Sequence, residues 1–155
     1  MNTPEIRPFA DPDLEACADL FIQVFSRPPW NDRWPSTEVA YAYLKEFVDT
    51  PGFQGFVAIV DQQIVAFLLG HLKRWWSGSE YYIDEFGVHP DAQGQGIGTM
   101  LVDHLKQTLL QAGIYTITLL TARDTPAAAF YEKQGFVTHQ RMAFMSHRIT
   151  DQEEA

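Results

Sequence analysis

Cysteine, basic residues and long apolar runs are scarce in this sequence of 155 residues. Cys17 is the single cysteine, which excludes an internal disulfide and a cysteine-based metal cluster. Eleven Lys and Arg residues stand against 20 Asp and Glu, a formal net charge of −9, which argues against nucleic acid or anionic membranes as partners. No run of about 18 apolar residues occurs, so we expect no transmembrane helix.

Targeting and metal-binding patterns are also missing. The N-terminal residues MNTPEIRPFADPD show no basic segment followed by an apolar stretch, so we expect no signal peptide. The five histidines show no H-x-x-x-H spacing, and we expect no metal. These absences predict a soluble, cytoplasmic protein.

What the chain does contain is enough apolar surface for one proper core. Hydrophobic residues make up 46% and aromatic residues 14%, which excludes disorder as the main state. The length fits one domain, and we expect it to span residues 1–149, with residues 150–155 as a short acidic tail.

The apolar periodicity alternates between strand and helix spacing, and predicts a mixed α/β fold. The expected order is β-α-α-β-β-β-α-β-α-β-β, mostly antiparallel in its first half and with one β-loop-α-β unit in the middle. The strands are expected at 5–9, 53–60, 63–72, 81–88, 115–120, 136–138 and 143–147, and the helices at 11–25, 36–50, 97–112 and 125–134.

A glycine-rich loop, QGQGIGT at 93–99, lies between a predicted strand and a strongly periodic helix. Glycines let backbone N–H groups approach a ligand, and the first N–H groups of a helix form an anion site. We therefore predict phosphate binding, the alternative being a flexible loop with incidental glycines. The loop lacks the Lys of a P-loop and the spacing of a dinucleotide fingerprint.

Two motifs in this order resemble those of the GNAT acetyltransferase superfamily. Gln93-x-x-Gly96-x-Gly98 resembles its coenzyme-A pyrophosphate motif, and DTPAAAFYEKQGF at 124–136 resembles its Asn-x-x-Ala-x-x-Leu-Tyr-x-Lys-x-Gly-Phe signature. The predicted element order matches that of the family along nearly the whole chain. One departure is Asp124 at the position of the usual Asn, because a carboxylate accepts hydrogen bonds but donates none.

The resemblance implies a central sheet that splays after its fourth strand and acetyl-CoA as the acetyl donor. In the family the pantetheine arm lies in that opening, the valine before the loop pairs with it, and the loop holds the pyrophosphate. The cofactor-binding residues implied here are Val88, Gln93, Gly94, Gln95, Gly96, Ile97, Gly98, Thr99, Asp124 and Tyr131.

The resemblance also implies catalytic residues. Tyr131 occupies the position of the tyrosine that acts as an acid toward the leaving thiolate; its helical spacing alone is also typical of a core aromatic. Asp84 and Glu85 resemble the acidic pair of polyamine acetyltransferases, in which the first acid is the base, so Asp84 is expected as base and Glu85 second. Strand alternation sends the two to opposite faces unless a bulge intervenes, and they are alternatively hydrogen-bonded in the sheet or bind a cation.

The acceptor site in GNAT folds is lined by the first two helices and their connection. Here that connection contains Trp30, Asn31 and Trp34, which together with Asp84 and Glu85 are the predicted substrate-binding residues. Trp75 and Trp76 are expected to form an opposite wall; for these tryptophans packing under a loop is an equal alternative.

The sequence therefore predicts an N-acetyltransferase that moves the acetyl group of acetyl-CoA to a primary amine of a small molecule. A polyamine, an aminoglycoside or an amino-acid-like acceptor fits the acidic charge. The alternatives are a protein or peptide N-acetyltransferase and a non-catalytic acyl-CoA-binding regulatory module. A homodimer is also possible.

Overall fold

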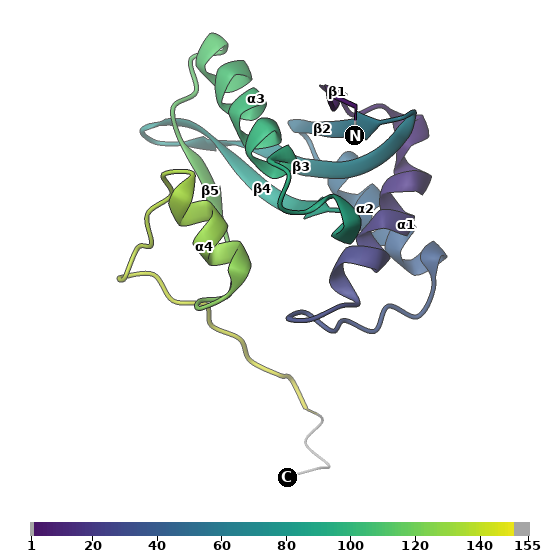
Figure 1. Ribbon diagram of the computed structural model, residues 1–155. Helices are drawn as coiled ribbons and strands as arrows, with labels where there is room; N and C mark the ends of the chain where they lie inside the picture. Colours follow the sequence, from purple (N-terminus) through teal and green to yellow (C-terminus); the bar gives the residue numbers. More distant parts are fainter. Residues whose placement is uncertain (1, 151–155) are drawn as a thin grey trace.

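A five-stranded sheet with strand order β1-β2-β3-β4-β5 organises the computed structural model, which describes residues 2–150 (Figure 1). Its first four strands are antiparallel neighbours, whereas β5 is parallel to β4 because α3 (Ile97–Gln111) crosses between them. The mixed α/β fold class is confirmed. The strands are β1 (Glu5–Pro8), β2 (Phe53–Val60), β3 (Gln63–Trp75), β4 (Gly78–Val88) and β5 (Ile117–Leu119).

Helices cover both faces of this sheet and bury two apolar cores. The first core lies under α1 (Leu14–Phe25) and α2 (Thr37–Val48), with side chains such as Phe67 and Leu69 from β3. The second lies under α3 and contains alternate residues of β2, β3 and β4, with α4 (Pro126–Lys133) packed against its edge. Short 3₁₀ turns, η1 (Asp11–Asp13) and η2 (Pro90–Ala92), precede α1 and α3.

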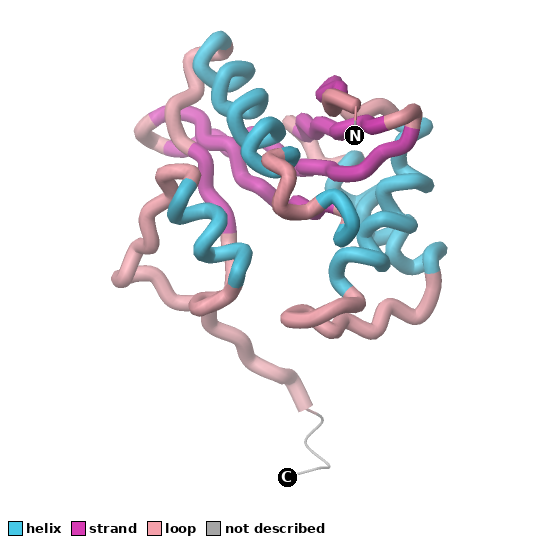
Figure 2. The backbone as a smooth tube through the Cα atoms, viewed as in Figure 1, coloured by secondary structure: helices cyan, strands magenta, loops and turns pink. Residues whose placement is uncertain are grey.

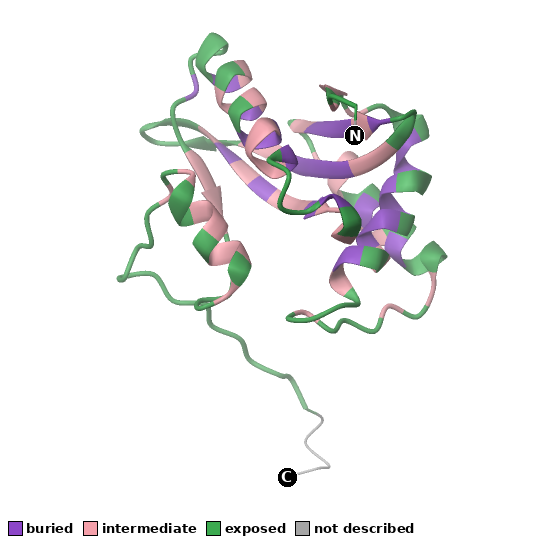
Figure 3. Cartoon of the chain, viewed as in Figure 1, coloured by how far each residue is buried: buried purple, intermediate pink, exposed green. Residues whose placement is uncertain are grey.

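The two predicted closing strands, 136–138 and 143–147, are wrong for this structure. Residues 136–149, which we call the closing segment, form neither strand nor helix (Figure 2), and every residue from 137 to 149 is exposed (Figure 3). A strand needs a neighbour for its backbone groups. Among the described residues this segment pairs with none.

Of the predicted tail 150–155, residues 151–155 lie outside the described residues. None of the helices within residues 2–150 has the length and apolar character needed to cross a membrane.

Candidate active site

The sheet splays between β4 and β5, as the family resemblance implied. The two strands pair only from Tyr81 to Ile83, although β4 continues to Val88. The N–H of His89 donates to the carbonyl of Val65 on β3 at 2.7 Å. Because backbone groups alternate sides along a strand, the N–H of Val88 faces the opening on the other side. Val88 therefore presents a backbone donor where the family resemblance placed the pantetheine arm.

A β-bulge in β4 determines where the two adjacent carboxylates point. Glu85 lies opposite Leu69 and Ile83 lies opposite Gly70, so Asp84 is the extra residue. Glu85 shares with Leu69 the face that α1 and α2 cover, and Asp84 reaches His71 on the same face. The bulge thus places both acids on one face, although regular alternation would separate them.

Glu85 is held by a tyrosine from α2. The Tyr43 hydroxyl donates a hydrogen bond to Glu85 Oε1 at 2.6 Å. Burial raises the pKa of the Glu85 carboxyl from 4.5 to about 7; the Tyr43 hydrogen bond lowers it, and the negative charges of Asp84 and Asp32 raise it further. A carboxyl with a pKa of about 7 exchanges its proton readily near neutral pH.

Asp84 has a different partner. His71 Nδ1 and Asp84 Oδ2 are hydrogen-bonded at 2.7 Å, and the Asp84 side chain is only 7% exposed. Burial raises the pKa of Asp84, against the hydrogen bond and charge of His71. Sequence reasoning missed both Tyr43 and His71. Tyr43 lies in the predicted helix 36–50, but no spacing signal linked it to Glu85 or His71 to Asp84.

Tyr131 approaches the same region from α4. Its ring lies among Phe86, Phe130 and Phe136, with the Phe86 ring centroid 6.2 Å away. Burial, and then the negative charge of Glu85, raise the pKa of Tyr131 above its ordinary value of 10. The phenol is therefore neutral, and a hydrogen-bond donor, throughout the physiological range.

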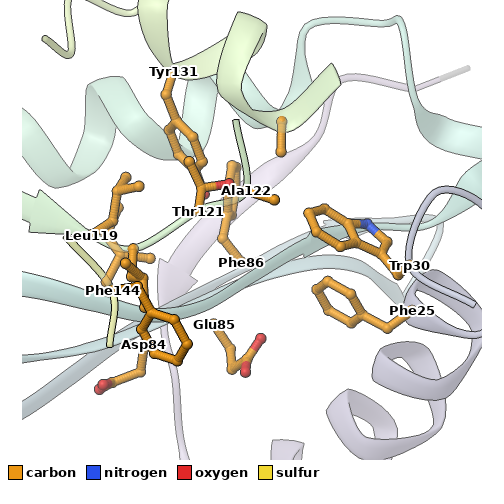
Figure 4. Close-up of a pocket in the computed structure, with 13 residues that line it drawn as sticks. Phe25, Trp30, Asp84, Glu85, Phe86, Leu119, Thr121, Ala122, Tyr131 and Phe144 are labelled. Carbon is orange, nitrogen blue, oxygen red and sulfur yellow. The ribbon is translucent and has the colours of Figure 1, made fainter. Parts of the chain in front are cut away.

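A cavity of about 470 Å³ brings these groups together, a size typical of small-molecule sites. In Figure 4 Tyr131 enters from one side and Asp84 and Glu85 from the other, with their carboxyl groups pointing in different directions. Trp30 and Phe25 form a further wall. The remaining lining residues are Ile83, Phe86, Leu119, Leu120, Thr121, Ala122, Ala127 and Phe144.

The other predicted acceptor residues lie apart from this cavity. Trp34 packs against Phe21 and Tyr43, with ring centroids 5.0 and 4.9 Å away, within the core under α1 and α2. Asn31 is exposed and does not line the cavity. Trp75 and Trp76, at the far end of the β3–β4 hairpin, are also exposed and do not line it.

The glycine loop forms the N-terminus of α3. Gly96 is the N-cap residue with φ +85°, Gly94 has φ +77°, and a Cβ at either position would meet nothing within 4 Å. The N–H groups of Ile97, Gly98 and Thr99 have no acceptor within the helix, and its first turn carries no acidic residue. This open turn has the donors and the space that a pyrophosphate requires.

Side chains around the loop hold its backbone rather than face outward. The Gln93 amide donates to the Val88 carbonyl at 3.0 Å, and the Gln95 amide donates to the Asp91 carbonyl at 3.3 Å. The Thr99 hydroxyl accepts a hydrogen bond from Gln134 just after α4. Ile97 is buried in the core. The backbone is thus the part of the loop left free for a ligand.

Asp124 lies outside the cavity. It is exposed, has φ +57°, and precedes Thr125, whose hydroxyl caps α4 by accepting the N–H of Ala128. With this positive φ, Asp124 lies in the turn that leads into α4. Its role toward a coenzyme stays a prediction.

Comparison with known proteins agrees with this geometry. Residues 15–136 match the model of the acetyltransferase (GNAT) family. An acetyltransferase from Pectobacterium atrosepticum is 31% identical over 150 residues, which cover 96% of this chain and 99% of the relative. The splayed mixed sheet and the glycine loop of this chain are therefore features of an acetyltransferase.

Solved structures give the same fold at lower identity. An aminoglycoside acetyltransferase from an uncultured soil sample, in complex with trehalose, superimposes with a TM-score of 0.74 at 22% identity, covering 95% of this chain and 97% of that one. AAC(6')-Iy, in complex with the bisubstrate analogue CoA-S-monomethyl-acetylneamine, gives 0.74 at 16% identity, covering 96% and 100%. The chain belongs to the GNAT family and is an acetyltransferase.

Proposed function

We propose that this acetyltransferase moves the acetyl group of acetyl-CoA to a primary amine of a small molecule, by direct attack in a ternary complex. The observation that carries the proposal is the 470 Å³ cavity, into which Tyr131 and the pair Asp84 and Glu85 reach from opposite sides of the splayed sheet. Acyl transfer between a thioester and an amine requires an acid and a base around one space, and these residues have the chemistry for both roles.

The coenzyme fits the groups at the start of α3. Gly94 and Gly96 leave open space where a side chain would stand, and the free N–H groups of the first turn complement a pyrophosphate. The N–H of Val88, in the opening between β4 and β5, would hold the pantetheine arm. When bound, acetyl-CoA supplies the acetyl group as a reactive thioester.

Glu85 is the better candidate for the general base, in place of Asp84, which the resemblance put first. A protonated amine with a pKa near 10.4 must lose its proton before it attacks. The pKa of Glu85 is about 7, so the carboxylate accepts a proton and returns it to solvent near neutral pH. Asp84, hydrogen-bonded to His71, is then left to attract the cationic acceptor.

The first prediction concerns the dependence of rate on pH. In the wild type kcat/KM should rise with pH along a limb whose pKa is about 7, because Glu85 must be deprotonated to act. Glu85→Gln should lower kcat about 100-fold and remove that limb. Tyr43→Phe should move the limb to higher pH, because the Tyr43 hydrogen bond lowers the pKa of Glu85. Steady-state kinetics from pH 5.5 to 9 measure all three.

Unfolding provides a control that does not depend on turnover. Between pH 4.5 and about 7 the folded protein keeps the Glu85 proton that the unfolded chain releases, so the free energy of unfolding falls by about 3 kcal/mol as pH rises. Glu85→Gln should lose this decline in denaturant titrations at pH 5 and 8. A rate limb near pH 7 that survives in Glu85→Gln would assign the base to another group.

The acceptor proposed here is a small amine with both a cationic and an apolar part. The cavity offers carboxylates at one side and the rings of Trp30 and Phe25 at another, and aromatic faces attract ammonium groups. Polyamines, aminoglycosides and amino-acid-like amines have this chemistry. The solved neighbours that are aminoglycoside acetyltransferases support the aminoglycoside class. A cytoplasmic location and a homodimer belong to the same proposal.

A second prediction separates the two tryptophans of the α1–α2 connection. Trp30→Ala should raise the KM for the amine about tenfold with little change in Tm, because Trp30 lines the cavity. Trp34→Ala should lower the stability by about 2–3 kcal/mol, because its ring packs on Phe21 and Tyr43. Equal KM values for wild type and Trp30→Ala would remove Trp30 from the acceptor site.

The experiment that tests the function is thiol release from acetyl-CoA, screened across polyamines, aminoglycosides, amino acids and peptides. Turnover with a small amine confirms the proposal and gives the acceptor class, whereas turnover with peptides alone favours a peptide acetyltransferase. Calorimetric binding of acetyl-CoA without turnover on any member of the panel favours a regulatory binding module. Absence of both would contradict the assignment of the loop.

A further inference from the structure

The helix that carries Tyr131 is short and weakly buried. α4 has eight residues, none of which is fully buried, and a helix of this length is not stable by itself in water. Aromatic rings surround Tyr131, with centroids 5.3 to 6.2 Å from its own. Aromatic pairs are favourable over separations of about 4.5 to 7 Å, so these contacts leave the phenol oxygen room to shift. An acid in a reaction needs closer control of its position than that.

Gln134, the C-cap residue of α4, supplies two directional contacts to α3. Its side-chain Nε2 donates to the Thr99 hydroxyl at 2.9 Å, and its backbone carbonyl accepts from Lys106 Nζ at 2.7 Å. The N–H of Gln134 in turn donates to the carbonyl of Tyr131 at 3.0 Å. One residue therefore connects the backbone of Tyr131 with α3.

The two partners on α3 are placed for this contact by the helical period. Thr99 and Lys106 are seven residues apart, close to two turns, so they lie on the same face of α3. Lys106 also satisfies a carbonyl at the end of α4, where the helix dipole is negative. Two bonds at different ends of Gln134 resist rotation of α4 as well as its displacement.

Thr99 connects this contact to the glycine loop. It lies in the first turn of α3, whose free N–H groups are proposed above to bind the pyrophosphate. The neighbouring Gly98 packs under α4, because a Cβ at Gly98 would meet the Phe130 ring at 3.3 Å. That apolar contact sets the separation between α4 and the loop, and the Gln134 hydrogen bond adds direction. The place of Tyr131 is thus set from the same turn that faces the coenzyme.

We propose that Gln134 is a positioning residue, which fixes the Tyr131 phenol relative to the coenzyme by tying α4 to the first turn of α3. Gln134 does not line the 470 Å³ cavity, so it acts through Tyr131 rather than on the substrates. A bound coenzyme restrains Thr99, and the hydrogen bond to Gln134 passes this restraint to α4. The effect on turnover rests on the proposed function of Tyr131, whereas the link between α4 and the loop does not.

The first experiment follows hydrogen–deuterium exchange in the full-length protein, with and without acetyl-CoA. Amides of a short, exposed helix exchange through local opening. In the wild type, saturating acetyl-CoA should slow exchange of residues 126–134 about tenfold. Gln134→Ala should lose most of this slowing, while calorimetry gives a Kd for acetyl-CoA within about threefold of wild type. Gln107→Ala removes an exposed glutamine of α3; as the matched control it should keep both.

The second experiment is a double-mutant cycle on kcat, with the amine that gives the fastest turnover in the thiol-release screen. Gln134→Ala should lower kcat about tenfold. In the Tyr131→Phe background the same substitution should lower kcat by less than about twofold, because the hydroxyl that it positions is already absent. General damage to the fold would lower kcat by the same factor in both backgrounds. Lys106→Met removes the other bond of Gln134 and should repeat the pattern.

The outcomes of the exchange experiment decide the link. If acetyl-CoA does not slow exchange of α4 in the wild type, or slows it equally in Gln134→Ala, the link is overturned. If Gln134→Ala loses as much affinity for acetyl-CoA as it loses in kcat, Gln134 is a coenzyme-binding residue and the proposal is overturned. Circular dichroism checks that each variant is folded, and Lys106→Met decides the question if Gln134→Ala does not fold.

The kinetic cycle separates this proposal from the proposed function. Equal losses of kcat from Gln134→Ala in both backgrounds overturn the positioning of Tyr131. A wild-type kcat in Tyr131→Phe alone contradicts the acid proposed above, and that single variant distinguishes the two failures. If no amine is acetylated, the proposed function fails, and the exchange experiment with acetyl-CoA still decides whether Gln134 ties α4 to the loop.

Discussion

Tyr131→Phe should lower kcat about 100-fold and leave the Kd for acetyl-CoA nearly unchanged. The phenol oxygen is the only group that the substitution removes, and the ring keeps its contacts with Phe86 and Phe136. A hydrogen bond to the developing thiolate strengthens only in the transition state, so its loss affects turnover rather than binding. Steady-state kinetics and calorimetry with acetyl-CoA measure the two quantities.

Tyr115→Phe is the matched control, because Tyr115 is 80% exposed and lies outside the 470 Å³ cavity. It should leave both quantities unchanged. In the wild type, turnover should also show no loss through Tyr131 ionisation below pH 10, because burial raises the pKa of this phenol above its ordinary value. Equal losses of turnover and of coenzyme affinity in Tyr131→Phe would mean that the tyrosine binds the coenzyme and does not act as the acid.

Local patterns were sufficient to predict where the glycine loop lies in the fold. Its glycines stand where a strand signal changes to a helix signal, and the structure begins α3 at Ile97, as expected. The residues that hold the loop, Gln93 and Gln95, act through hydrogen bonds to backbone carbonyls only five and four positions distant. Every part of this motif is close in sequence, so the sequence alone contains the information.

The acidic pair shows where such reasoning ends. Alternation predicts opposite faces for Asp84 and Glu85, and only the bulge brings them to one face. The bulge arises from the register between β3 and β4, which depends on the whole hairpin. Tyr43 and His71 lie 42 and 13 positions from the acids that they contact, so no spacing rule connects them.

The closing strands were predicted from the apolar pattern of residues 136–138 and 143–147, and the structure forms neither. A strand becomes stable through its neighbours, and the sequence of the segment does not say whether a neighbour lies beside it. The apolar run Met142–Met145 and the bare edge of β5 are each visible in the sequence or in the fold. Only the fold shows that the two do not pair.

Gly96→Val should lower the affinity for acetyl-CoA by more than 100-fold without unfolding the protein. Gly96 has φ +85°, a region that a β-branched residue avoids, and a Cβ there would point into open space rather than into a neighbour. The cost to stability is therefore about 1–2 kcal/mol of backbone strain. The larger loss comes from the ligand, because the new side chain stands where the pyrophosphate must approach the N–H groups of α3. Calorimetry with acetyl-CoA measures it.

Gly113→Val provides the matched control at the opposite end of the same helix. Gly113 has φ +74°, and a Cβ there also meets nothing within 4 Å, so the strain is comparable while no coenzyme group is expected nearby. The two variants should lose similar stability in thermal unfolding, but only Gly96→Val should lose coenzyme binding. If both variants bind acetyl-CoA as tightly as wild type, the two glycines serve the helix alone. If both variants lose the same amount of affinity for acetyl-CoA, the effect comes from damage along α3, because strain is the one property that the two positions share.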